Sequence, residues 1–211
     1  MRHFIANERY YPKGSLFSRV RCVDQDTALK FFNGDIALSD FYPPNPQKYD
    51  TSEGRFNAKK ESVLYLADHP YIAMKECDVS IDDMFLLSYF SSQKNMCFLE
   101  IEDSAHPLSS LMYRLFLAKD KRFYPVINLV YSQLLKFDKY DGIVYKSTKA
   151  IDEKIMDDKW GEIHSIVNIA INAGNVKNFK FELSWLNSCG SNYFPIQYSI
   201  FYPLSNKKYV N

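Results

Sequence analysis

The chain has 211 residues, of which 46% are hydrophobic, 16% aromatic and 24% charged, so it is an ordinary globular protein with a ring-rich core. This composition excludes intrinsic disorder, which needs few aromatic residues and a large net charge. The formal net charge is +1, and a general nucleic-acid binder usually carries a basic surplus, so we expect no direct nucleic-acid partner.

Taken in chain order, the residue pattern predicts an α+β protein with mixed or antiparallel twisted sheets and flanking helices. Helices are expected at 25–32, 69–77, 107–118 and 124–137. Strands, rich in β-branched and aromatic residues, are expected at 62–67, 96–102, 142–146, 165–171, 179–186 and 196–203, and the alternating stretch 16–22 can be another. Residues 40–54 contain three prolines and predict a loop. Asp68 is the expected cap of the helix at 69–77, with Pro70 in its first turn.

The termini and the cysteines bear on the compartment. The start, MRHFIANERYYPKG, has no apolar signal-peptide core, and apolar runs such as 85–90 are far shorter than the ~20 residues of a membrane span. We therefore expect a cytoplasmic protein with no membrane partner. The four cysteines form no CxxC pair, which predicts small buried thiols and neither a zinc site nor a disulfide framework. No GxGxxG or GxxxxGK[ST] motif occurs.

Two polar residues stand next to apolar elements. Glu76 lies on the same helix stripe as Ile72 and Ala73, so its carboxylate pairs with a cation, lines a pocket, or extends to the edge of the helix. Spacing alone favours the last of these, a side chain at the helix edge. Ser147 follows the apolar strand at 142–146, where a serine is usually a turn residue. Without a GxSxG elbow or a nearby His–Asp arrangement, nothing indicates that it is a nucleophile.

Arg19 and Arg21 alternate within the stretch 16–22. In a strand, both side chains would point to one face, where two guanidinium groups can bind a diphosphate through paired hydrogen bonds. The alternative is a pair of surface arginines that contact solvent or a carboxylate.

In their order and spacing, these segments resemble the RES domain family, named for an arginine, a glutamate and a serine. The resemblance extends from about Leu16 to Ile171. It is carried by LFSRVR at 16–21, GRFN at 54–57, VLYLA at 63–67, AMKE at 73–76, Gln133, YDGIVYKS at 140–147 and Val167-Asn168. The Pro-Gly that often follows the family's GRxN is replaced here by AKKE at 58–61, so that turn is expected to differ.

The resemblance implies a fold similar to ADP-ribosyltransferases of the diphtheria-toxin kind. It implies a bacterial toxin of a type II toxin–antitoxin pair that consumes NAD+ by hydrolysis or phosphorolysis, with NAD+ as substrate and no metal. The implied protein partner is a cognate antitoxin, often with an Xre-like DNA-binding domain. Residues 1–174 would form the RES domain that binds NAD+, and residues 175–211 a C-terminal β extension packed on the same domain.

Carried over by position, the resemblance implies catalytic and NAD+-binding residues. The catalytic set is Glu76, Arg55 and Ser147, and the binding set is Arg19, Arg21, Asn57, Tyr65 and Gln133. Arg19 is favoured over Arg21 as the family arginine.

Cleavage of the nicotinamide–ribose bond leaves an oxocarbenium-like centre, which a fixed carboxylate can stabilise. Glu76 would supply that carboxylate, and Arg19 and Arg55 would hold the diphosphate. Tyr65 would stack on the nicotinamide ring, and Ser147 would hydrogen-bond the nicotinamide amide or a ribose hydroxyl. Two alternatives stay open: an ADP-ribosyltransferase that modifies a protein target, and a non-catalytic protein-interaction module.

Overall fold

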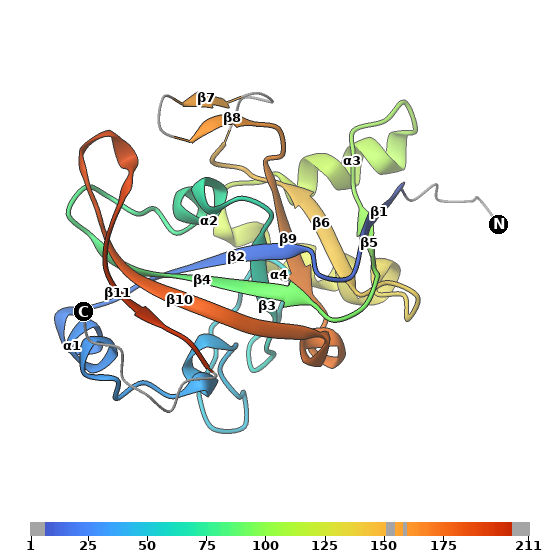
Figure 1. The fold of residues 1–211 in the computed structure, drawn as a ribbon. Coiled ribbons are helices and arrows are strands. Elements are labelled where there is room, and N and C mark those ends of the chain that lie inside the picture. Colours follow the sequence, from blue (N-terminus) through green and yellow to red (C-terminus); the bar gives the residue numbers. More distant parts are fainter. Residues whose placement is uncertain (1–6, 151–154, 158–159, 204–211) are drawn as a thin grey trace.

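A computed structural model describes residues 7–150, 155–157 and 160–203, and confirms the α+β class (Figure 1). Nine strands form one sheet, in the order β1 (Asn7–Tyr11), β5 (Met96–Glu100), β6 (Gly142–Lys146), β9 (Val167–Ile171), β3 (Leu64–Ala67), β2 (Leu16–Cys22), β4 (Met84–Ser92), β10 (Phe179–Cys189) and β11 (Pro195–Phe201). Strands β5 and β6 pair in parallel and the other neighbours pair antiparallel, so the sheet is mixed. A separate hairpin joins β7 (Ile155–Asp157) and β8 (Gly161–Ile163).

The helices are short and flank the sheet. They are α1 (Gln25–Asn33), α2 (Pro70–Glu76), α3 (Pro107–Phe116) and α4 (Tyr124–Val130). Shorter 3₁₀- or π-helical segments are η1 (Leu38–Phe41), η2 (Lys121–Phe123), η3 (Tyr131–Leu135), η4 (Ala173–Asn178) and η5 (Ser191–Tyr193). The prediction of a single helix at 124–137 is wrong in detail. The observed segment changes after Val130 from α-helix to the wider π-helical turn η3, in which the Lys136 amide donates a hydrogen bond to the Tyr131 carbonyl.

The start of α2 differs from the prediction. His69 caps the helix, its Nδ1 accepting the Tyr71 amide proton at 3.2 Å, while Pro70 occupies the first turn as expected. The Asp68 carboxylate instead accepts a hydrogen bond from the Ser165 hydroxyl. Asp68 thus ties the end of β3 to the segment before β9.

Two strands of the sheet have no counterpart among the predicted elements. Strand β4 lies between β2 and β10, and its run MFLLSYFSS is mostly buried because both faces are covered. A continuous apolar run of this kind shows no alternation, so periodicity cannot distinguish it from a buried helix. Strand β1, NERYY, is a mostly polar edge strand paired only with β5. The two strands expected beyond residue 175 are present as β10 and β11, and they continue the sheet past β4.

The sheet is strongly twisted, and its two halves differ in direction. In Figure 1, β2, β4 and β10 run across the view, whereas β9 and β6 run down it. The halves meet where β2 and β3 pair, and that ladder has a single register pair, Ser18 with Ala67. Beyond Ser18, β2 therefore separates from β3. Helix α2 contacts β2, β3 and β9 at this junction.

The buried side chains form three clusters around the sheet. One contains Phe17, Phe31, Phe41, Phe90 and other rings, and lies against α1 and η1. A second surrounds α2, and a third lies between the sheet and helices α3 and α4. The expected aromatic-rich core is confirmed.

The cysteine prediction is only half right. All four cysteines are free, but Cys22 and Cys77 are exposed, and only Cys189 is fully buried. None of the helices in the described part of the chain is long and apolar enough to cross a membrane.

Candidate active site

Glu76 and Ser147 come from different elements and meet in a direct hydrogen bond. Glu76 ends α2, and Ser147 directly follows β6. The Ser147 hydroxyl donates to Glu76 Oε1 at 2.6 Å, and its oxygen accepts the amide protons of Ala150 at 3.0 Å and Lys149 at 3.2 Å. Because the two amides occupy the oxygen's lone pairs, the hydroxyl proton is directed at the carboxylate. The result is a short charge-assisted bond from a serine that is only 3% exposed.

Lys149 fixes the end of α2 from the same segment. Its Nζ donates to the Glu76 main-chain carbonyl at 2.8 Å and forms an ion pair with Asp78 at 2.6 Å. A cation is favourable at a helix C-terminus, where carbonyls lack partners and the helix dipole is negative. The 147–150 segment therefore contacts both the side chain and the backbone of Glu76.

Tyr145 lies behind this pair. It is two residues before Ser147 on β6, so both side chains lie on the same face of the strand. Tyr145 is 7% exposed, and burial, together with the nearby Glu76 carboxylate, raises the pKa of its phenol well above the ordinary value. Its hydroxyl is therefore protonated at neutral pH.

Arg55 is a buried cation packed between aromatic rings. The side chain is 8% exposed, with its guanidinium carbon 5.5 Å from the Tyr124 ring centre and 5.9 Å from that of Tyr145. Its Nη1 donates to the Phe116 carbonyl. Within the described part of the chain, no carboxylate forms an ion pair with Arg55. A buried guanidinium held only by rings and a carbonyl is a strong attractor for an anionic group.

The loop that carries Arg55 is fixed by Asn57 and Tyr65. The Tyr65 hydroxyl accepts the Phe56 amide proton at 2.8 Å and donates to Asn57 Oδ1 at 2.8 Å. Asn57 Nδ2 donates to the Ser52 carbonyl at 3.0 Å. Gly54 is required here, since a Cβ at that position would lie 2.3 Å from Asn57 Oδ1. Burial also raises the pKa of Tyr65. The polar groups of Asn57 and Tyr65 thus hold the loop, while the Tyr65 ring lies on the strand next to it.

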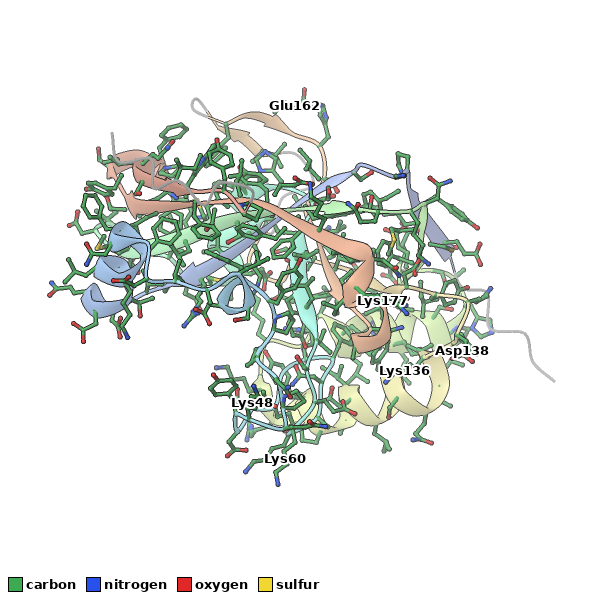
Figure 2. All side chains as sticks on the ribbon, turned by 60° about the horizontal axis from the view of Figure 1, so that its bottom comes forward. Lys48, Lys60, Lys136, Asp138, Glu162 and Lys177 are labelled. Carbon is green, nitrogen blue, oxygen red and sulfur yellow. The ribbon has the colours of Figure 1, made fainter. Side chains whose placement is uncertain are left out.

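The turn after this loop, at 58–61, contains a left-handed residue that is not glycine. Lys60 adopts a positive φ of 66°, the conformation that glycine takes most easily. The Glu61 amide closes the turn on the Ala58 carbonyl at 3.0 Å. Lys60 is exposed and projects away from the body of the molecule, near Lys48 (Figure 2).

Arg19 and Arg21 lie on one face of β2, as the alternation predicted. Arg19 donates to the Phe41 carbonyl at 2.6 Å, and Arg21 to the Asp40 carbonyl at 3.4 Å. Desolvation lowers the pKa of Arg19 to about 10. The Cys77 thiol, next in sequence to Glu76, donates to the Val20 carbonyl at 3.2 Å, so although the residue as a whole is exposed, desolvation of its sulfur raises the Cys77 pKa to about 11. Arg19 is half-buried and Arg21 is exposed.

Gln133 does not join this cluster. It is exposed in η3, and within the described residues it makes no hydrogen bond to Glu76, Ser147 or Arg55. Two cavities also lie apart from these three residues. One, of about 620 Å³, is lined by Arg9, Glu100, Lys146 and neighbours, and another, of about 590 Å³, by Phe56, Asn128, Leu129 and neighbours. In the described part of the chain, no three His, Cys, Asp or Glu side chains gather as a metal ion would require.

Three further residues of the site were not identified from the sequence. The alternation of YKS in 145–147 places Tyr145 on the Ser147 face, so this signal was available. Tyr124 and Lys149 reach Arg55 and Glu76 only through the tertiary fold, and no local pattern marks them.

Comparison with known proteins gives one match. A family model described as the RES domain matches residues 34–180, which is most of the chain. The match includes Arg55, Glu76 and Ser147, while Arg19 and Arg21 precede it. No curated protein and no solved structure matches significantly.

Proposed function

The chain belongs to the RES domain family, and from this we propose that it is an enzyme that consumes NAD+ by cleaving the bond between nicotinamide and ribose. The acceptor of the ADP-ribosyl group would be water or phosphate. The observation that carries the proposal is the hydrogen bond between Glu76 and buried Ser147, which fixes a carboxylate close enough to Tyr145 to raise the pKa of its phenol, while the Tyr145 ring packs against Arg55.

Cleavage of the nicotinamide–ribose bond would give the Glu76 carboxylate its role. As the C1′–N bond breaks, its electron pair moves to the pyridinium nitrogen, and positive charge develops on the ribose. A carboxylate held near C1′ stabilises that charge more in the transition state than in the ground state. Unit charges 4 Å apart at an effective dielectric of ~20 interact by about 4 kcal/mol, an upper scale of roughly a thousandfold in rate. Glu76 would provide this interaction, with Ser147 and Lys149 holding it in place.

Two arginines, Arg55 and Arg19, would bind the diphosphate of NAD+. Arg55 has no carboxylate partner within the described residues and is already desolvated, so a phosphate that binds it loses little to competing water. Arg19, on the strand β2 that α2 contacts, would contribute a second cation. Holding the diphosphate fixes the ribose in register with Glu76.

A direct test is an NAD+ assay on the purified protein, with and without phosphate, the products being separated by chromatography. The proposal expects nicotinamide plus ADP-ribose, or plus ADP-ribose-1″-phosphate when phosphate is present. Glu76→Gln should abolish this activity. The matched control is Glu182→Gln, because Glu182 also accepts a hydrogen bond from a serine, Ser91, at 2.5 Å, but on β4 and β10. Intact NAD+ at high enzyme concentration would refute the proposal.

The physiological role follows from the same activity. We propose that NAD+ loss makes the protein a toxin, and that a cognate antitoxin protein neutralises it. Induced expression in a bacterial host should then arrest growth, and Glu76→Gln should relieve the arrest while Glu182→Gln does not. Growth arrest by the Glu76 variant at equal protein levels would argue instead for a function independent of catalysis.

A further inference from the structure

Asn168 lies on the same face of the sheet as the candidate active site. It is on β9, directly opposite Tyr145 of β6 and Ala67 of β3, in antiparallel ladders. Side chains at directly opposite positions of such ladders share a face. Ala67 packs with Ile72 and Ala73 of α2, the helix that ends at Glu76. Asn168 is therefore covered by α2 and lies beside Tyr145.

The side-chain NH₂ group of Asn168 is buried without a hydrogen-bond partner among the described residues. The residue is 4% exposed, and no acceptor in that part of the chain lies within hydrogen-bond reach of its Nδ2. Such a group is costly to keep, and buried amides are normally paired. The asparagine of the Arg55 loop shows the usual case, because Asn57 Nδ2 donates to the Ser52 carbonyl. A donor left unpaired beside Tyr145, on the face of the sheet that α2 covers, indicates a partner that arrives with the substrate.

We propose that Asn168 is a specificity-determining residue, whose side-chain NH₂ donates a hydrogen bond to an oxygen in the nicotinamide-riboside half of NAD+. This inference rests on the proposed function. We assign the acceptor to this half because Asn168 lies opposite Ala67, which packs against α2, the helix that ends at Glu76. That half offers two acceptors, the carboxamide oxygen and the ribose hydroxyl oxygens.

The first test replaces the amide by an apolar group of similar volume. Asn168→Leu should raise the KM for NAD+ at least tenfold while leaving the melting temperature of the free protein unchanged or higher, because the lost amide had no partner. Asn187→Leu is the matched control. Asn187 is 1% exposed on β10, and its Nδ2, unlike that of Asn168, is paired: it donates to the Trp185 carbonyl at 3.0 Å, while its Oδ1 has no partner among the described residues. The control should lower the melting temperature and leave the KM unchanged.

A second substrate identifies the acceptor. Nicotinic acid adenine dinucleotide carries a carboxylate in place of the carboxamide, and the preference for NAD+ over this analogue is measured as a ratio of kcat/KM. If Asn168 bonds the carboxamide oxygen, Asn168→Leu should reduce that ratio. If it bonds a ribose hydroxyl, both substrates should lose equally and the ratio should persist. Either result supports the assignment of Asn168 as a substrate donor.

The outcomes that overturn the inference are distinct from those that overturn the function. If Asn168→Leu retains the wild-type KM and kcat, Asn168 is not a substrate donor. If that variant does not fold, Asn168→Ser and Asn168→Ala decide, because serine keeps a donor and alanine does not. Equal KM values for these two would overturn the inference. If the wild-type protein leaves NAD+ intact, the proposed function itself has failed.

Discussion

Removing the Ser147 hydroxyl tests how the candidate site is held together. In Ser147→Ala, Glu76 loses a 2.6 Å charge-assisted hydrogen bond, and the amides of Lys149 and Ala150 lose their acceptor. A hydrogen bond to a charged group contributes about 1.5–3 kcal/mol. If this free energy serves to hold Glu76 in its catalytic position, kcat should fall roughly 10- to 150-fold, since about 1.4 kcal/mol corresponds to a factor of ten.

The control for this variant is Ser91→Ala. Ser91 is 7% exposed and donates to Glu182 Oε1 at 2.5 Å, so it reproduces the burial and the serine–glutamate bond away from α2. Both variants should lower the free energy of unfolding, measured in urea, by about 1–3 kcal/mol. Only Ser147→Ala should lower kcat in the NAD+ assay.

A double-mutant cycle completes this test. If Ser147 acts through Glu76, Ser147→Ala should have no further effect on the residual activity of Glu76→Gln. A Ser147→Ala enzyme with wild-type kcat, or one whose loss matches that of Ser91→Ala, would refute the positioning argument.

Three other predictions concern the Arg55 loop and a buried acid. Arg55→Met should raise the KM for NAD+ about tenfold or more. Arg55→Lys should restore little, because an ammonium group lacks the planar guanidinium fork that binds phosphate through two hydrogen bonds. Equal KM values for Arg55→Met and wild type would show that Arg55 does not bind NAD+. Gly54→Ala should destabilise the protein by about 1–3 kcal/mol in urea unfolding, since its Cβ would lie 2.3 Å from Asn57 Oδ1, whereas Gly174→Ala, with no atom within 4 Å, should change stability little. Burial raises the pKa of Asp68, so ionisation of this carboxyl in the folded state destabilises the protein as the pH rises above the ordinary carboxyl pKa. Asp68→Asn should therefore be more stable than wild type at pH 7. The difference in melting temperature should shrink as the pH falls toward 4 and vanish once the carboxyl is protonated in the unfolded state as well. A difference that grows as the pH falls would contradict that assignment.

The sequence predicted the parts of the fold that carry a local signal. The alternation in LFSRVRC predicted β2 and the shared face of Arg19 and Arg21, and both are present. It did not predict β4, because a strand buried on both faces has no alternation. Nor did it predict how α-helix changes to π-helix after Val130, which depends on how individual carbonyls are paired.

Several residues of the candidate site could be predicted from the sequence, but their contacts could not. The segments with Arg55, Glu76 and Ser147 could be named from their order, but their contacts arise from the sheet order β6-β9-β3-β2, which crosses the chain order. The prediction that spacing favoured for Glu76, a side chain extended to the helix edge, is wrong, because its carboxylate is bound by buried Ser147. No local pattern reports a partner 71 residues away.

The two halves of the site are not independent of one another. Arg55 is positioned by a loop that Tyr65 and Asn57 hold, and Glu76 by the segment after β6. Tyr145 interacts with both halves, since its ring centre lies 5.9 Å from the Arg55 guanidinium carbon while the charge of the Glu76 carboxylate raises the pKa of its phenol. A shift of the loop would therefore move a ring whose hydroxyl interacts electrostatically with Glu76. For this reason binding of an anionic group at Arg55 and orientation of the carboxylate at Glu76 should be coupled through Tyr145, although the two residues lie on separate elements.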